Sequence, residues 1–276
     1  MDDVEALLRD LRTREPGRPR LTWYGSGHER VELSGKVLDN WVAKTAGLLA
    51  EEFDAGPGTR VLLDLPPHWR TVTWTLATWL TGACVVLADG TVGIDVLTVG
   101  TDVLVTADPA AAAAAAARYP DVPCAVVALP ALAMSFDGDL PLGAIDAAIE
   151  VRLQDDVFAA YVRIDPTAEA LDIVGPGREQ ALTITHADLL TRARALAPDT
   201  GARVLLDAGA NTTSGTGTGS TGVTATGAAR DPLTTWLPPL CVNGSVVIVH
   251  HLASLTDDAR AALVDAERIT GWSPPS

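Results

Sequence analysis

The stretch ALDIVGPGREQALTITHADLLTRARAL, residues 170–196, contains the pattern that decides the fold. It places a glycine-containing turn ahead of a short apolar strand at residues 182–185, and Thr185 and His186 then open an amphipathic helix. Short β-branched runs alternate with helical segments along the rest of the chain as well. Such an alternation is typical of an α/β fold with mostly parallel sheets flanked by helices.

The remaining β-branched runs predict the other strands of the sheets. Each is short and mostly apolar, as strands buried on both faces are. Together with residues 182–185, the predicted strands are 60–65, 84–88, 102–106, 125–129, 203–207 and 245–250.

Helices are predicted between these strands. Residues 33–53 have helical periodicity, and Ser34 is the expected N-cap. Asp108 followed by Pro109 predicts the start of a second helix in the alanine run, because Pro is favoured in the first helical turn.

Two segments rich in turn-forming residues divide the chain. The first, 130–143, is expected to join two halves, 1–130 and 144–276, of one domain that covers residues 1–276. The second, 209–227, consists almost entirely of Gly, Thr, Ser and Ala, which predicts a flexible loop. Its string of Gly and Thr is similar to a phosphate-binding loop but lacks the lysine that such a loop carries.

Composition argues against several classes of protein. The 276 residues are 47% hydrophobic, which is enough for a substantial core. The formal charge of -15 and the lack of a basic stripe argue against a nucleic-acid partner, because phosphate binding depends on clustered Lys and Arg. The sequence has no secretory signal and no run of roughly 20 apolar residues, so we expect no membrane association and a cytoplasmic location.

The three cysteines are expected to be reduced core thiols. Cys84, Cys124 and Cys241 occur singly in apolar surroundings. Zinc sites use closely spaced ligand pairs, so the spacing predicts no metal site.

Residues 170–196 resemble the phosphate-loop region of AMP-binding, adenylate-forming enzymes, the superfamily that includes acyl-CoA synthetases. In that family a loop rich in Ser, Thr and Gly and ending in a lysine precedes a hydrophobic strand, a Thr-His pair and a helix. Other segments resemble the family in the same order along the chain, and these are 21–23 with the helix that follows, 56–67, 79–87 and 237–247. The resemblance implies the N-terminal domain of these enzymes without the C-terminal domain, in a short, degenerate relative of actinobacterial type.

Aligned on the Thr-His pair, the loop departs from the family pattern. Gln180 stands at the position of the lysine, and Asp172 stands where the family has small hydroxyls, so a triphosphate would lose its main cation and meet a carboxylate. The resemblance therefore implies a degenerate binding region for AMP or ATP, with no catalytic or metal-binding residue assigned. Its residues are Gly175, Gly177, Arg178, Thr183, Thr185 and His186.

Three functions are compatible with this pattern. The favoured hypothesis is a truncated, catalytically inactive protein that acts as a nucleotide- or acyl-ligand-binding module or as an interaction module. The alternative is a divergent ATP- or AMP-dependent ligase, in which Arg178 and His186 or a separate partner domain replace the lost groups. The second alternative is an oligomeric scaffold that joins itself or a protein partner through an exposed face with Trp69, Trp74 and Trp79.

The other aromatic and histidine residues are assigned structural roles. Tryptophans at five-residue spacing pack a core or an interface more often than they stack on a ligand. His250 and His251 are expected to point to opposite faces of the strand 245–250, which would prevent them from sharing a ligand. His68 has no partner that the sequence identifies.

Overall fold

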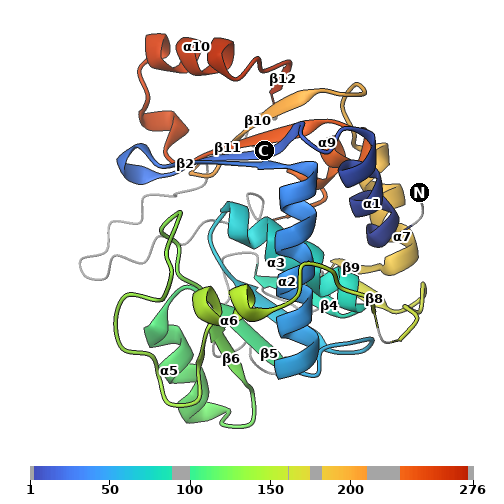
Figure 1. The fold of residues 1–276 in the computed structure, drawn as a ribbon, viewed down its shortest axis with the longest axis vertical. Helices are drawn as coiled ribbons and strands as arrows, with labels where there is room; N and C mark the ends of the chain where they lie inside the picture. The colour runs from blue at the N-terminus through green and yellow to red at the C-terminus, as the bar shows by residue number, and fades with distance from the viewer. Residues whose placement is uncertain (1–2, 89–99, 161, 175–181, 210–230, 273–276) are drawn as a thin grey trace.

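The computed structural model describes residues 3–88, 100–160, 162–174, 182–209 and 231–272. Two β-sheets lie one above the other, with helices between them and on their outer faces (Figure 1). The predicted α/β fold with mostly parallel sheets is therefore confirmed. The predicted flexible loop at 209–227 lies outside the described residues, apart from Gly209.

The larger sheet has seven strands in the order β7-β6-β5-β3-β4-β8-β9. It is parallel except at one edge, where β9 runs antiparallel to β8. Its strands are β3 (Arg60–Asp64), β4 (Cys84–Ala88), β5 (Val103–Thr106), β6 (Cys124–Val126), β7 (Ile145–Asp146), β8 (Glu169–Val174) and β9 (Leu182–Thr185). The predicted strands in this region are all present, but β8 was missed, because Glu169 and Asp172 interrupt its apolar run.

The smaller sheet has five strands in the order β12-β10-β11-β1-β2. Its strands are β1 (Pro19–Tyr24), β2 (Arg30–Ser34), β10 (Arg203–Asp207), β11 (Ser245–Val249) and β12 (Gly271–Trp272). β1 runs parallel to β11, although they lie more than two hundred residues apart in the sequence. Each sheet thus contains strands from both 1–130 and 144–276, and the division of the domain into these halves stays a prediction.

The matched segment 21–23 belongs to a hairpin of β1 and β2 that precedes the long helix. Neither of these two antiparallel strands was among the predicted strands. The helix α2 begins only after β2, where the Ser34 hydroxyl accepts a hydrogen bond from the Val37 amide at 3.3 Å. Ser34 is therefore confirmed as the N-cap of α2, which begins directly after β2.

Short polar side chains cap most of the helices at their N-termini. Asp108 accepts from the Ala110 amide at 2.8 Å and caps the alanine-rich helix, as predicted. The helices are α1 (Val4–Arg14), α2 (Gly35–Glu52), α3 (Trp69–Thr81), α5 (Pro109–Arg118), α6 (Ala147–Leu153), α7 (His186–Ala195), α9 (Leu237–Cys241) and α10 (Asp257–Ala266), with 3-10 turns η1 (Ser26–His28) and η3 (Leu252–Ser254).

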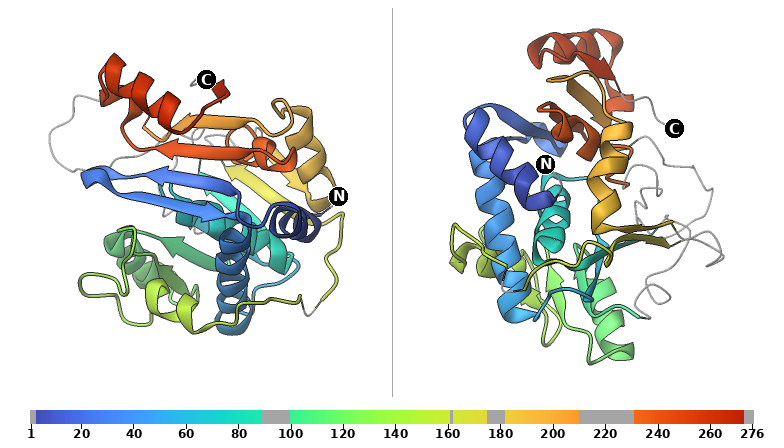
Figure 2. Two further views of the ribbon diagram at one scale, coloured as in Figure 1. Left: turned by 45° about the horizontal axis from the view of Figure 1, so that its top comes forward. Right: turned by 90° about the vertical axis from the view of Figure 1, so that its right-hand side faces the viewer.

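The helix α3 lies between the two sheets (Figure 2), and the main hydrophobic core consists of residues of α3, its neighbouring helices and both sheets. Alternate residues of β10 and β11 face this core, and the intervening ones, Leu205 and Val247, face α10 and η3. The outer face of the larger sheet packs against α5 through residues such as Leu62 and Ala112. Helix and sheet layers therefore alternate, which places the first turn of α3 between the two sheets.

The cysteines are buried and form no disulfide with one another, as expected for core thiols. Burial raises the pKa of Cys84 to about 12 and that of Cys241 to about 11, so both stay protonated at neutral pH. In the ranges that the structure describes, His, Cys, Asp and Glu form no group of three that could hold a metal ion. No helix within those ranges has the length and apolar character needed to cross a membrane.

Candidate functional site

The strand that precedes the predicted phosphate loop contains a paired carboxylate. Asp172 on β8 is ion-paired with the guanidinium of Arg60, which also contacts Glu169 at 2.9 Å. These contacts raise the pKa of Arg60, against the effect of its burial. The carboxylate that a triphosphate was predicted to meet is therefore paired with Arg60 of β3.

The predicted site residues that the structure describes lie at the end of β9 and the start of α7. Thr183 is exposed and pairs with Asp172 across the antiparallel ladder. Thr185 is the N-cap of α7, and its hydroxyl accepts from the Asp188 amide at 3.3 Å. Gly175, Gly177 and Arg178 lie outside the described residues, so their place in the site stays a prediction.

His186 connects α7 to the end of α3. The ring is buried, and its Nε2 lies 3.1 Å from the Gly82 carbonyl, to which it donates when that nitrogen carries the proton. Burial lowers the pKa of His186, which favours the neutral ring. These contacts hold two elements of the fold together, and they leave ligand binding by His186 as a prediction.

A second region of interest lies at the carboxyl ends of the parallel strands. A cavity of about 570 Å³ is bordered by residues that follow β1, β3, β6 and β11. Ligands of open α/β sheets bind outside the carboxyl ends of strands. The residues around the cavity are Trp23, Ser26, Gly27, Glu29, Pro66, Pro67, His68, Leu129, Pro130 and His250.

A neighbouring cavity of about 520 Å³ shares Glu29 with the first. The Glu29 carboxylate accepts a hydrogen bond from the Ala131 amide at 3.0 Å. The walls of this second cavity include the indole rings of Trp41 and Trp69, whose centroids lie 5.4 Å apart. The two cavities thus flank the first turn of α3.

His68 begins α3 and has a defined tautomer. Its Nδ1 accepts a hydrogen bond from the Arg70 amide at 3.1 Å, so in the neutral ring the proton is on Nε2. Burial, with a smaller contribution from the charge of Arg70, lowers the pKa of His68 to about 3. The ring packs against Trp23, at 4.2 Å between centroids. Trp23 in turn requires Gly25, since a Cβ there would lie 2.1 Å from the indole Cη2.

The two adjacent histidines after β11 contact each other, contrary to the prediction. β11 ends at Val249, so His250 and His251 lie in the turn that follows, and His251 has a left-handed backbone with φ of 62°. Their rings are 3.8 Å apart in an edge-to-face arrangement. Burial lowers the pKa of His250, and the neighbouring His251 lowers it further.

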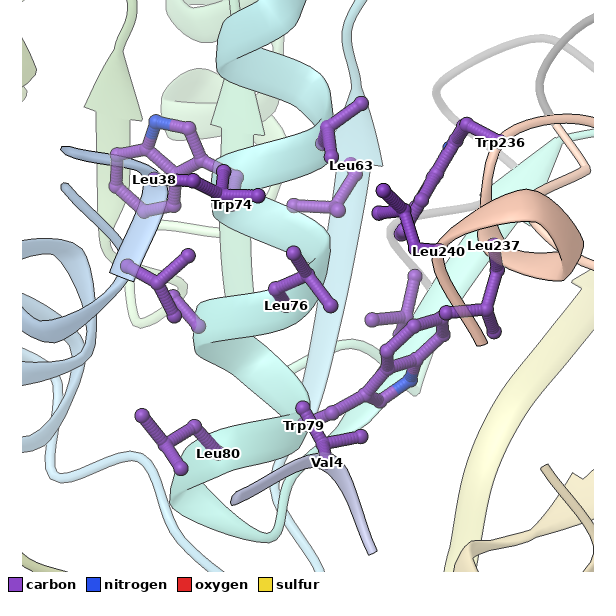
Figure 3. Packing of buried hydrophobic residues seen from close by; sticks show 14 of the residues in the cluster. Val4, Leu38, Leu63, Trp74, Leu76, Trp79, Leu80, Trp236, Leu237 and Leu240 are labelled. Atoms are coloured by element: carbon purple, nitrogen blue, oxygen red, sulfur yellow. The ribbon is translucent and has the colours of Figure 1, made fainter. Parts of the chain in front are cut away.

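The tryptophans of α3 form no exposed face. Trp69, Trp74 and Trp79 are all buried in the main core. Figure 3 shows Trp74 on the side of Leu38, whereas Trp79 points toward α9. The exposed tryptophan face on which the scaffold hypothesis was based is therefore not present.

Comparisons with known proteins bear on the fold. No protein-family model matches this chain. Over 152 residues the chain is 37% identical to the TIGR03089 family protein of Mycobacterium tuberculosis, and the match covers 55% of this chain and 60% of that protein.

Two solved structures are similar over nearly the whole chain. An acyl-CoA synthetase of Brucella canis superposes with a TM-score of 0.72 at 16% identity, covering 98% of this chain and 46% of that one. MbtA of Mycobacterium smegmatis gives a TM-score of 0.69 at 20% identity, covering 99% of this chain and 48% of that one. The fold is that of the N-terminal domain of adenylate-forming enzymes. This chain spans about half the length of those structures.

The resemblance stated from the sequence is thus confirmed at the level of the adenylate-forming fold. The mycobacterial relative also supports the predicted actinobacterial kinship. No function was predicted for His68 and Arg70, and Trp69 was included only in the exposed face of the scaffold alternative, although the three residues are consecutive at the start of a helix. The available signal was the position of this His-Trp-Arg run directly after a strand and two prolines.

Proposed function

We propose that this chain is a relative of adenylate-forming enzymes. It binds a nucleotide or an acyl small molecule and does not itself catalyse the adenylation of a carboxylic acid. The observation that carries the proposal is the position of its lysines. The chain has only Lys36 and Lys44, and both belong to α2. The Lys44 ammonium lies 2.8 Å from the Asp156 carboxylate and also donates to the Gln154 carbonyl.

Adenylation passes through a highly charged transition state at phosphorus. Enzymes stabilise such charge with fixed cations and bound magnesium. In this chain the family resemblance puts Gln180, an uncharged amide, at the lysine position. The cation nearest to β8 in the described contacts, Arg60, is already paired with Asp172 and Glu169. A ligand with fewer phosphate charges, such as AMP or an acyl compound, fits this arrangement better than ATP.

Two measurements test the proposal. We expect no exchange of pyrophosphate into ATP with any of a panel of carboxylic acids. In calorimetric titrations we expect AMP to bind at least as tightly as ATP, with or without magnesium. Exchange above background in the unmodified chain would show that it adenylates and would refute the proposal.

Restoring the lysine provides a gain-of-function test. Gln180→Lys is expected to increase ATP affinity about tenfold, which corresponds to a contribution of about 1.4 kcal/mol from an ion pair between the lysine and a phosphate. Gln154→Lys adds the same charge at the end of α6 and serves as the matched control. An equal gain in both variants would mean that net charge, and not the loop, determines the affinity.

The divergent-ligase alternative gives a different result. It requires Arg178 and His186 to act on the nucleotide, so Arg178→Ala would weaken binding of ATP or an acyl nucleotide. The contact of His186 with the Gly82 carbonyl does not favour that role.

A further inference from the structure

Donor nitrogens without a partner gather at the first turn of α3. Within the described ranges, His68 Nε2, Trp69 Nε1 and Arg70 Nε are buried and have no hydrogen-bond acceptor. The Leu129 carbonyl lies near the His68 ring and opposes the fall of its pKa, but it is not in hydrogen-bonding geometry with Nε2. Trp23 Nε1, on the ring that packs against His68, has no acceptor either. In the neutral or cationic forms of these side chains the four nitrogens can only donate, and each lacks an acceptor among the described residues.

Arg70 is the charged member of this group. It is only 6% exposed, and no carboxylate in the described parts of the chain pairs with its guanidinium. Burial, and then the like charge of Arg152, lowers the pKa of Arg70 to about 10, so the group is still cationic at neutral pH. A buried charge without a counter-ion is unfavourable, and native proteins normally pair it.

The surroundings of Arg70 are aromatic. Its guanidinium carbon lies 4.4 Å from the ring centroid of Trp69 and 5.9 Å from that of Trp41. Such rings attract a cation but supply no hydrogen-bond acceptor in the guanidinium plane. The same two indoles form walls of the 520 Å³ cavity, so the rings on which Arg70 stacks also border space for a ligand.

The helix itself adds to the positive potential. α3 has 13 residues, and its N-terminus lies just after the carboxyl end of β3. The N-terminus of a helix favours negative charge through its dipole and its unpaired amides. The one carboxylate that borders both cavities, Glu29, is bonded to the Ala131 amide and is not paired with Arg70.

We propose that the first turn of α3 is a binding site for an oxyanion, a carboxylate or a phosphate, carried on an apolar or aromatic body. The oxyanion pairs with Arg70, and the body occupies the 520 Å³ cavity that Trp41 and Trp69 border. This site goes beyond the proposed function. It lies at the opposite end of α3 from Gly82, which contacts His186, so the two binding regions can be tested separately.

Small probes distinguish the two kinds of oxyanion. Benzoate tests a carboxylate, phenyl phosphate and inorganic phosphate test a phosphate, and benzamide and benzyl alcohol are the uncharged analogues. Titration is followed by calorimetry and by the fluorescence of the indoles at the site. We expect at least one aromatic anion to bind saturably and at least tenfold more tightly than its uncharged analogue. Equal affinity for benzoate and benzamide, or no anion binding, would overturn the proposal.

Arg70→Met removes the charge and keeps much of the apolar stem. We expect it to weaken anion binding at least tenfold and, without ligand, to raise the melting temperature, because a buried unpaired charge is lost. Arg70→Lys keeps the charge, retains measurable binding and allows the test if the methionine variant does not fold.

Arg118→Met is the matched control, since Arg118 is exposed and its guanidinium also lies over a ring, that of Tyr119, at 5.6 Å. It should leave anion affinity unchanged. An equal loss of affinity in Arg118→Met would refute the proposal, as would an Arg70→Met variant that is less stable and still binds the anion.

Discussion

The two ends of α3 differ in how their buried polar groups are paired. At the C-terminal end, Trp79 Nε1 donates to the Ala170 carbonyl at 2.7 Å, and His186 contacts the Gly82 carbonyl at 3.1 Å. Gly82 adopts the left-handed conformation, with φ of 87°, that ends helices. At the N-terminal end, His68, Trp69 and Arg70 each have a buried nitrogen with no hydrogen-bond partner in the part of the chain that the structure describes.

The contrast separates residues that maintain the fold from residues that are available to a ligand. A buried donor without an acceptor costs about 1–3 kcal/mol, so a cluster of them at one helix end is unfavourable unless something else binds there. The C-terminal end contains the family-like residue His186, yet its contacts are internal to the fold. The N-terminal end was given no ligand-binding role from the sequence, yet among the described residues it has unsatisfied groups and neighbouring cavities.

Truncation of a tryptophan at each end gives the largest expected difference. Trp79→Ala should lower the free energy of unfolding by about 3–5 kcal/mol, because the side chain is fully buried and hydrogen-bonded. Trp69→Ala should cost about 1–3 kcal/mol, since its ring borders a cavity and its Nε1 has no acceptor among the described residues. Urea denaturation measures both, and an equal or larger loss for Trp69→Ala would remove the contrast.

Much of the fold could be predicted from local sequence. The β-branched runs that became β3, β4 and β10, and the caps at Ser34 and Asp108, depend on neighbouring residues alone. The pairing of β1 with β11 depends on contacts between distant segments, which composition and periodicity do not contain. The ion pair between Arg60 and Asp172 also joins distant segments, so it could not be predicted from local sequence.

The candidate site was less predictable than the fold. Thr185 and His186 were chosen because they match a family motif, and the structure gives both of them contacts within the fold. Arg70 could not be chosen, because an arginine at a helix start is ordinarily exposed or paired. Only the tertiary structure shows that Arg70 is buried against two indoles and that no described carboxylate pairs with it.

The free energy of unfolding should fall in acid because of His68, which lies at the N-terminal end of α3. Its pKa in the folded protein, about 3, is below the ordinary value of 6.5, so the folded state binds fewer protons than the unfolded state. The stability contributed by the neutral ring is therefore present above pH 6.5 and is lost as the pH falls toward 3. Between pH 8 and pH 5 this loss is about 2 kcal/mol.

The control for this pH dependence is His68→Asn. Asparagine is a good N-cap and can still accept from the Arg70 amide, but it does not titrate. The free energy of unfolding of His68→Asn, measured by urea denaturation across this pH range, should fall less steeply than that of the unmodified chain. Parallel pH profiles would mean that the N-terminal end of α3 does not contribute to acid sensitivity.

The smallest expected effect concerns the helix that follows the predicted phosphate loop. Thr185→Ala removes the N-cap of α7 and should lower the free energy of unfolding by about 1 kcal/mol. Thr191→Ala, at an exposed position of the same helix, should be neutral or slightly stabilising, because alanine favours helix. If Thr185 serves only the fold, calorimetric titration of Thr185→Ala with AMP should give unchanged affinity. A loss of AMP affinity without a loss of stability would instead return Thr185 to the binding site and weaken the distinction between the two ends of α3.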